Sequence, residues 1–213
     1  MKILQILIVF SLILGFNFFT NAQVCGYTFI TVYLKDNGGN PIKNAQFKFF
    51  DPAYDSEGLH ENNLMAWNDE KNAYFGKEGM CGGHRNVKLE IFAEGFESFS
   101  RQVDLPLGWE SFSIRLKRKG TSEKTNFEPL AYFRGNISPD KGILYSETQI
   151  KLTDKNGKQF ETISKNGRFA LEVPIGIYKI EFINSEDFLP TVFEQKNLDK
   201  GSNFVEIVIK NKN

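Results

Sequence analysis

The feature that most constrains the fold of this chain is an alternation of apolar and polar side chains with a period of two residues, which runs from Thr28 almost to the C-terminus. Successive side chains of a β-strand point to opposite sides, so this alternation is typical of strands with one buried face. The spacing of three or four residues that an amphipathic helix needs is not sustained over any useful length. The sequence therefore predicts an all-β fold. The predicted inward faces are Ile30, Val32 and Leu34; Ala45, Phe47 and Phe49; Val87, Leu89, Ile91 and Ala93; Phe112, Ile114 and Leu116; Phe169, Leu171 and Val173; Tyr178, Ile180 and Phe182; and Val205, Ile207 and Ile209.

Turn residues separate these predicted strands at short intervals. The stretch KDNGGNP at 35–41 ends the first strand, and Asn156-Gly157 and Asn166-Gly167 each lie between two alternating runs. Asn-Gly is a strong hairpin signal because both residues accept the positive φ of a type I′ turn. The stretch 51–83 is polar and contains several glycines, so we expect long loops there around a short segment near 73–75. Many short strands with turns between them are typical of a β-sandwich.

A run without apolar residues, KRKGTSEKTN at 117–126, divides the predicted strands into two groups. Such a run is typical of a solvated connector. We therefore predict two tandem antiparallel β-sandwich domains of the Ig-like or prealbumin-like class, at residues 23–117 and 129–213, with a polar linker at 118–128. The two groups also look like repeats of one unit, because VKLEIFAEGF at 87–96 takes the same place in the first group as YKIEFINSEDF at 178–188 in the second.

The N-terminus has the composition of a cleavable secretory signal. Lys2 precedes an apolar run that extends to Phe19, and Thr20 and Ala22 provide small residues for cleavage after Ala22. We expect residues 1–22 to be removed and no later segment to cross a membrane. Two alternatives stay open. The run could remain as an uncleaved anchor, although no basic stop-transfer cluster follows it, and Cys25 could be lipidated, although the residues before it are not both small.

Two cysteines, Cys25 and Cys81, remain after this cleavage. Export would place them in an oxidising compartment, where such a pair tends to form a disulfide. The bond would close a loop of 57 residues, and the chain-entropy description of disulfides gives about 4 kcal/mol of stabilisation for that length. We therefore predict a disulfide between Cys25 and Cys81.

Several short motifs in both groups of strands are shared with one known family. They are Gly135-Asn136-Ile137, Gln149-Ile150-Lys151-Leu152 and the run from Asn166-Gly167 through Pro174-Ile175-Gly176-Ile177-Tyr178 in the second group, and Pro41-Ile42-Lys43-Asn44-Ala45 and Ala93-Glu94-Gly95-Phe96 in the first. In these motifs the chain resembles the carboxypeptidase regulatory-like domain, a transthyretin-like β-sandwich. The first group departs from the pattern, because Cys81-Gly82-Gly83-His84 replaces the Pro-x-Gly-x-Tyr segment. The resemblance implies a sandwich fold and a role as a spacer, folding aid or interaction module, but no catalytic set.

Charge and histidine content limit the possible functions. Lys and Arg together number 26, as do Asp and Glu, so the chain lacks the electrostatic footprint of a nucleic-acid-binding protein and we exclude that class of partner. His60 and His84 are its two histidines. His60-Glu61 does not begin a zinc-peptidase helix, because Leu64 stands where the HExxH motif needs its second histidine.

Two groups of residues have the chemistry of metal ligands. They are Cys81 and His84 with His60 or Cys25 for zinc, and Asp51, Asp55 and Glu57 for calcium. The exported context favours a disulfide over a zinc site, and the spacing of the acidic residues fits no EF-hand. We therefore expect no metal, no cofactor and no catalytic residue.

Four aromatic residues, Tyr54, Trp67, Tyr74 and Trp109, are expected in or beside loops, where their rings could contact a ligand or fold back over the sandwich. We expect an exported, non-catalytic binding or scaffold module, secreted, periplasmic or at the cell surface, whose partner is an envelope or extracellular protein. The alternative is a carbohydrate-binding module that uses Trp67, Tyr74 and Trp109 for a glycan. An enzyme is a third functional class, which only the acidic loops and the two histidines support.

Overall fold

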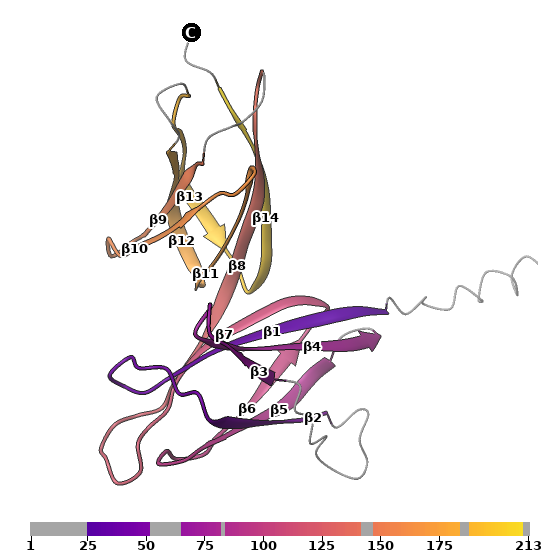
Figure 1. Ribbon diagram of the computed structural model, residues 1–213, viewed down its shortest axis with the longest axis vertical. Coiled ribbons are helices and arrows are strands. Elements are labelled where there is room, and N and C mark those ends of the chain that lie inside the picture. Colours follow the sequence, from indigo (N-terminus) through magenta and orange to yellow (C-terminus); the bar gives the residue numbers. More distant parts are fainter. Residues whose placement is uncertain (1–24, 52–64, 82–83, 142–146, 184–187, 211–213) are drawn as a thin grey trace, which may run out of the picture.

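The computed structural model describes residues 25–51, 65–81, 84–141, 147–183 and 188–210, and all the regular elements in these ranges are β-strands (Figure 1). The strands are β1 (Cys25–Lys35), β2 (Ala45–Phe50), β3 (Met65–Asn68), β4 (Ala73–Cys81), β5 (His84–Ala93), β6 (Phe99–Leu105), β7 (Gly108–Arg115), β8 (Asn126–Pro139), β9 (Gln149–Asp154), β10 (Gln159–Ile163), β11 (Arg168–Pro174), β12 (Gly176–Ile183), β13 (Thr191–Leu198) and β14 (Gly201–Ile209). The all-β fold is thereby confirmed. No helix in the described ranges could span a membrane. The predicted signal peptide, Tyr54, Asp55, Glu57 and His60 lie outside them.

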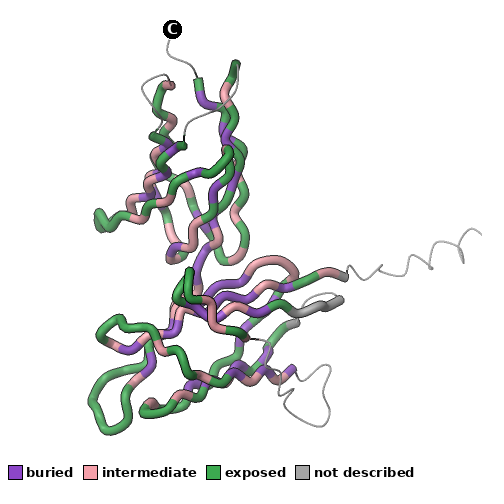
Figure 2. Tube along the Cα trace, in the orientation of Figure 1, coloured by how far each residue is buried: buried purple, intermediate pink, exposed green. Residues whose placement is uncertain are grey.

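The first sandwich, β1 to β7, packs a sheet containing β3, β4, β1 and β7 against a sheet of β2, β5 and β6. Its core is made of the inward faces that the alternation predicts, and Val32, Leu34, Leu89, Ile91 and Ile114 are fully buried there. Figure 2 shows buried residues alternating with more exposed ones along the strands, and mainly exposed residues in the loops. Period-two alternation therefore located this core correctly.

The second sandwich, β8 to β14, packs β11, β8 and β14 against β10, β9, β12 and β13. Its core is a separate cluster, in which Phe133, Ile150, Leu152 and Phe182 are fully buried. No residue belongs to both clusters, so each sandwich has its own apolar interior.

The two sandwiches repeat one topology. In each of them the first strand pairs with the fourth and the seventh, and the fifth pairs with the second and the sixth. We align the two sandwiches by the pairing registers of their first strands. In this alignment Thr28 corresponds to Ala131, Tyr74 to Phe169 and Gly108 to Gly201. The third strand differs, because β3 pairs with β4 whereas β10 pairs with β9. The repeat suggested by the sequence pattern is thus present in the strand order.

Two strand pairs depart from the expected antiparallel arrangement. β1 pairs in parallel with β7, and β8 pairs in parallel with β14, while the other pairs are antiparallel. Alternation fixes which side chains point inward but carries no information on strand direction, so the sequence pattern could not reveal this. The loop expected over 51–83 also contains β3 and β4. Small and charged residues at Gly76, Lys77 and Glu78 hide the strand pattern of β4.

β8 is shared by the two sandwiches and joins their sheets. Its beginning, Asn126 to Leu130, pairs with β7, and its continuation from Ala131 to Pro139 pairs with β14. Residues 126–128 of the expected linker 118–128 therefore belong to a strand, and Phe127 packs against the first core. The junction between the sandwiches is a continuous strand within one seven-stranded sheet.

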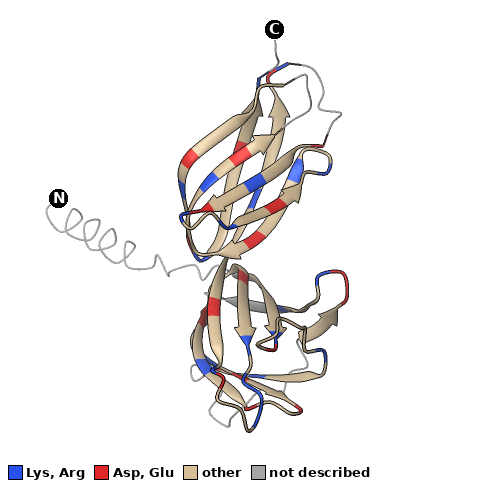
Figure 3. Cartoon of the chain, turned by 90° about the vertical axis from the view of Figure 1, so that its left-hand side faces the viewer, with Lys and Arg blue, Asp and Glu red and all other residues tan. Residues whose placement is uncertain are grey.

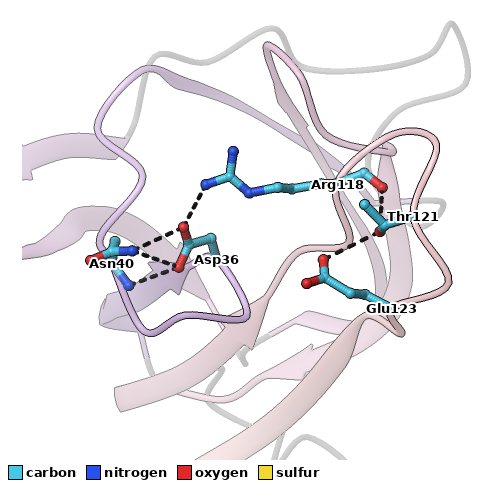
Figure 4. Close-up of polar contacts among 5 residues, drawn as sticks. All are labelled: Asp36, Asn40, Arg118, Thr121 and Glu123. Atoms are coloured by element: carbon cyan, nitrogen blue, oxygen red, sulfur yellow. Dashed lines mark hydrogen bonds and ion pairs between the residues drawn. The ribbon is translucent and has the colours of Figure 1, made fainter.

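The segment before β8 is held by hydrogen bonds and an ion pair (Figure 4). Arg118 contacts the buried carboxylate of Asp36 in the β1–β2 turn at 2.7 Å, and the backbone N–H of Asn40 donates to the same carboxylate at 2.8 Å. Thr121 donates to Glu123 at 3.3 Å. These contacts attach the expected linker to the end of the first sandwich that lies away from β8 to β14.

The two Asn-Gly turns have different conformations. Asn166 and Gly167 both have positive φ, and Lys165 and Arg168 exchange backbone hydrogen bonds, which confirms a type I′ hairpin there. At the other site only Gly157 has positive φ, and its N–H donates to the carbonyl of Asp154. The prediction of a type I′ turn is wrong at this second site, because the Asp154 carboxylate accepts from the N–H groups of Asn156 and Lys158 and stabilises a longer turn.

Candidate functional site on the outer sheet face

The outer face of the seven-stranded sheet carries a row of aromatic side chains. Tyr27 and Phe29 come from β1, Trp109 from β7 and Tyr132 from β8; we call these four residues the aromatic row. They occupy the strand positions that alternate with the buried core residues of the same strands, so they project from the side of the sheet opposite both cores. Phe75 of β4 lies beside the row.

Within the aromatic row the rings stack against one another across neighbouring strands. The ring centroids of Phe29 and Trp109 are 4.5 Å apart with an interplanar angle of 17°, and those of Trp109 and Tyr132 are 4.8 Å apart at 22°. These distances match the spacing of strands in a sheet, as expected for rings that stand side by side on it. Both faces of the Trp109 ring are therefore covered by its neighbours.

Lys77 of β4 places a positive charge at the open end of the aromatic row. Its ammonium nitrogen is 3.8 Å from the ring centroid of Tyr27 and 5.7 Å from that of Phe29. Such cation–π contacts contribute about 0.5–1 kcal/mol at exposed sites. Tyr27 is 54% exposed, so this end of the row combines aromatic surface with a cation that solvent or a partner can reach.

At the other end of the row a carboxylate connects the two sandwiches. Glu172 of β11 accepts hydrogen bonds from the hydroxyl groups of Tyr33 on β1 and of Ser111 on β7, the latter at 2.6 Å. Ser111 is fully buried and Leu130 beside it is buried, although they lie on the outer face of the sheet. Burial and the Glu172 charge raise the pKa of Tyr33, so this phenol stays a donor at physiological pH.

A second charged contact joins the sandwiches on the core side of the sheet. Lys200, in the β13–β14 turn, lies 3.0 Å from the buried carboxylate of Glu110 on β7 and donates to the backbone carbonyl of Asp104 at 2.8 Å. Burial raises the pKa of Glu110, and Lys200 opposes that shift. Glu172 and Lys200 thus fix the second sandwich to β7 from both faces of the sheet.

The aromatic residues expected to contact a ligand are engaged with the protein itself. Tyr74 is 3% exposed, belongs to the first core and accepts a hydrogen bond from the Ala45 N–H at 2.8 Å. Trp67 packs against that core, donates to Asp69 at 2.8 Å and has Lys43 over its ring at 5.3 Å. Of the expected set that the structure describes, Trp109 alone belongs to the aromatic row.

The rest of the site was not anticipated from the sequence. Phe75, Tyr132 and Glu172 lie on the outer faces of β4, β8 and β11, whereas the alternation of apolar residues indicates only the inward faces of strands. The available signal was an excess of aromatic residues at the outward positions of the first strand, where Tyr27 and Phe29 alternate with Thr28 and Ile30. Such residues at solvent-facing strand positions indicate a covered or binding face.

The two cysteines predicted to form a disulfide are Cα partners in the pairing of β1 with β4, at the end of that ladder. Directly opposed residues of antiparallel strands have Cα separations of about 4.5–5.5 Å, which lies within the range that a disulfide spans. The backbone register is therefore compatible with the predicted bond between Cys25 and Cys81, which stays a prediction.

The polar groups of this site are engaged with one another. The Ser111 hydroxyl is buried and donates to the Glu172 carboxylate. Among the described residues no cluster of three or more His, Cys, Asp or Glu side chains could hold a metal ion. In Figure 3, charged residues of both signs alternate along the strands and turns of both sandwiches.

Comparison with known proteins gives structural matches alone. No model of a protein family matches the chain, and no curated protein sequence does. Among solved structures, shaft pilin SpaA from Lactobacillus rhamnosus GG is 10% identical over 89% of this chain and 99% of the pilin, with a TM-score of 0.32. A Streptococcal ancillary pilin is 12% identical over 87% of this chain and 62% of its own, at 0.30.

A Bacillus anthracis TIE protein is 16% identical over 88% of this chain, with a TM-score of 0.28. The chain spans 34% of the length of that protein and 62% of the ancillary pilin. All three TM-scores lie below 0.5, so none of these similarities indicates a function.

Proposed function

We propose that this protein is an exported, non-catalytic scaffold module that binds another protein through the outer face of its seven-stranded sheet. The observation that supports this most is the aromatic row, an aromatic surface on the side of the sheet opposite both cores. Aromatic residues are enriched at protein interfaces, and this row is half-buried except for the exposed Tyr27. Glu172 and Lys200 support the scaffold role, because they fix the two sandwiches to each other beside that surface.

The geometry of the rings favours a protein partner over a glycan. A sugar binds an aromatic residue by lying flat on a free ring face, and both faces of Trp109 are stacked against Phe29 and Tyr132. Tyr74 is buried, and Lys43 lies over the ring of Trp67. The row instead offers ring edges, between which side chains of another protein can pack.

Export and family membership are parts of the same proposal. The basis for export is the N-terminal sequence with its cleavage site after Ala22. The carboxypeptidase regulatory-like assignment is supported by turn residues that serve the fold: Tyr178 donates to the Pro174 carbonyl at 2.7 Å, and Gly95 of the A-x-Gly-Phe corner has a φ of 80°. N-terminal sequencing of the exported protein should begin at Gln23, and a chain that retains Met1 would contradict removal of the signal.

The binding proposal can be tested by site-specific photocrosslinking in the cells that produce the protein. A photoreactive phenylalanine analogue at Phe75 would report on the outer face, and the same analogue at Phe92, which is 39% exposed on β5, would serve as the matched control. We expect a covalent adduct with one different protein from position 75 and none from position 92. Equal adducts from both positions, or none from position 75, would refute binding through this face.

A further inference from the structure

The final strands of the two sandwiches have different surroundings. β7 lies between β1 and the beginning of β8, so both of its edges are paired. β14 pairs with β8 along one edge, and no strand of the described ranges pairs with the other edge. β14 accordingly lies at the margin of the upper sandwich in Figure 1. An unpaired edge offers backbone N–H and C=O groups to an incoming strand.

The repeat shows which strand such an edge accepts. β7 is completed by residues 126–130, which directly precede the part of β8 that pairs with β14. By the registers of the two sandwiches, residues 126–130 are equivalent to residues 23–27 before Thr28, of which the structure describes 25–27. Residues 126–130 pair with the second edge of β7, and their equivalent is the beginning of β1.

We propose that two copies of this chain join end to end, with the beginning of β1 of one copy pairing antiparallel to the free edge of β14 of the other. The β7–β8 pairs Ser111–Leu130, Phe112–Pro129 and Ser113–Glu128 fix the expected register. Transferred to the equivalent positions, they pair Phe204 with Tyr27, Val205 with Gly26, and Glu206 with Cys25. This inference goes beyond the proposed function, since it needs no protein other than the chain itself.

The side chains at these positions fit such a contact. Tyr27 is 54% exposed and Phe204 is 50% exposed, and both lie on the outer face of their sheets. Their equivalents at the internal junction, Leu130 and Ser111, are buried. Pairing would cover the two exposed aromatic rings with each other, and β-strand addition of this kind takes its affinity from the backbone bonds and its selectivity from such side-chain pairs.

The arrangement also brings one pair of opposite charges together, on a face that carries the Arg134 guanidinium 5.6 Å from the Phe204 ring as well. Lys77 is equivalent to Glu172, the residue that connects the sandwiches internally by contacting Tyr33 and Ser111. On the other copy, the residues equivalent to Ser111 and Tyr33 are Phe204 and Asn136, so Lys77 would lie beside them. Glu206 is the Cα partner of Asn136 in the β8–β14 ladder. The cation of Lys77 would therefore meet the anion of Glu206.

The contact differs in strength and symmetry from the internal junction. At the internal junction, Lys200 forms an ion pair with Glu110. In the contact between copies, Leu107 takes the place of Lys200 and Asn203 takes the place of Glu110, so no ion pair can form there. The contact between copies is therefore weaker, and assembly depends on concentration. Because it joins the tail of one copy to the head of the next, it is not closed by two-fold symmetry and extends into chains of copies.

The test is the molar mass of the purified exported protein over a wide dilution series, measured by sedimentation. We expect the mean mass to rise with concentration beyond that of a dimer, and Phe204→Lys to remain monomeric. Ile177→Lys, at a residue that is 57% exposed on β12, is the matched control and should assemble as the original does. Unfolding curves verify that both variants are folded. A monomer at all concentrations, or assembly of Phe204→Lys, would overturn the inference.

Charge reversal gives a second, independent measurement. Lys77→Glu and Glu206→Lys should each weaken assembly about tenfold, because each places like charges opposite one another. A mixture of the two variants contains two favourable contacts. The new glutamate of one variant faces the new lysine of the other, and the original Lys77 of the second variant faces the original Glu206 of the first. The mixture should therefore form alternating chains and recover the assembly of the original protein. Monomers in the mixture would contradict the proposed register. Because this experiment uses the purified chain alone, its outcome is independent of crosslinking at Phe75.

Discussion

The first and second sandwiches share a strand order and differ in the pairing of their last strands, β7 and β14. Their inward residues correspond closely: Leu34 and Ile137 are equivalent buried positions, as are Ile114 and Ile207. At their edges they diverge, because β7 is covered by β8 while β14 is paired on one side among the described strands. Inward residues therefore specify the shared fold, whereas outward and edge residues determine what each copy of that fold contacts.

The two sandwiches also solve one packing problem differently. Val32 of β1 is fully buried, and its equivalent in β8 is Gly135. A Cβ atom on Gly135 would lie 2.2 Å from the Val205 carbonyl oxygen and 3.0 Å from the Phe169 ring. In the first sandwich the Val32 side chain fills this space. In the second sandwich Phe169 and Val205 occupy it instead.

Reduction of the predicted disulfide should have the largest effect on stability and should act on the first sandwich. Cys25 and Cys81 are equivalent to Glu128 and Gly176, so the second sandwich has no such bond. Loss of a 57-residue closed loop lowers the free energy of unfolding by about 4 kcal/mol. Both tryptophans, Trp67 and Trp109, belong to the first sandwich and report its unfolding by fluorescence.

The outcome also tests whether the bond exists. Mass spectrometry of the exported protein should find no free thiol, and Cys25→Ser with Cys81→Ser should reproduce the effect of the reductant. An unchanged fluorescence transition in the presence of reductant would contradict the prediction.

Gly135→Ala should destabilise the second sandwich by about 3 kcal/mol, because the backbone oxygen of Val205 cannot move away from the added methyl group without disturbing the β8–β14 pairing. Gly176→Ala is the matched control, since a Cβ there meets only the Tyr178 ring at an ordinary 3.7 Å. Denaturant unfolding curves measure both. Equal stability of the two variants would show that the close approach at Gly135 can relax.

Glu172→Ala should weaken the coupling between the sandwiches by about 2 kcal/mol, since it leaves the Tyr33 and Ser111 hydroxyl groups without their acceptor. We expect the unfolding of the two sandwiches, followed by hydrogen exchange, to become less coincident. Glu161→Ala, which removes an exposed carboxylate bonded to Gln149, is the control and should change little. Identical exchange profiles for the two variants would exclude a coupling role for Glu172.

The smallest expected effect concerns the acid sensitivity of the first sandwich. Hydrogen bonds from Asn40, together with Arg118, lower the pKa of Asp36 to about 2. The folded state therefore prefers the ionised carboxylate, so the stability it provides is complete above the unfolded pKa near 4 and is lost as the pH falls towards 2. Asp36→Asn should flatten stability against pH in that window, which denaturant unfolding curves recorded at each pH measure.

Much of the fold follows from the sequence for a definite physical reason. Burial of one strand face requires period-two alternation, and this pattern identified the cores around Val32, Ile91 and Phe182. It also identified the hairpin at Asn166-Gly167, because positive φ at two consecutive residues has a narrow sequence signature. The parallel pairing of β1 with β7 depends on contacts across 80 residues of chain, on which local patterns are silent.

Little of the candidate site could be predicted in the same way. The sequence predicts Trp109 as an aromatic residue near loops, but its role depends on Phe29 and Tyr132, which the pairing of β1, β7 and β8 brings to its two faces. Tyr74 and Trp67 share its residue type, but tertiary packing places them in or against the core. Residue type alone does not distinguish a ring that fills an interior from one that covers a sheet.

The parallel pairing of the first and last strands of each sandwich also determines how the molecule responds to a pulling force. Tension along the chain enters β1 at Cys25 and leaves β7 at Arg115, at opposite ends of their ladder. The two strands are therefore drawn past each other, so that their hydrogen bonds share the load instead of breaking one after another. β8 and β14 repeat this arrangement, which makes the protein suited to remain folded while it is stretched between two attachments.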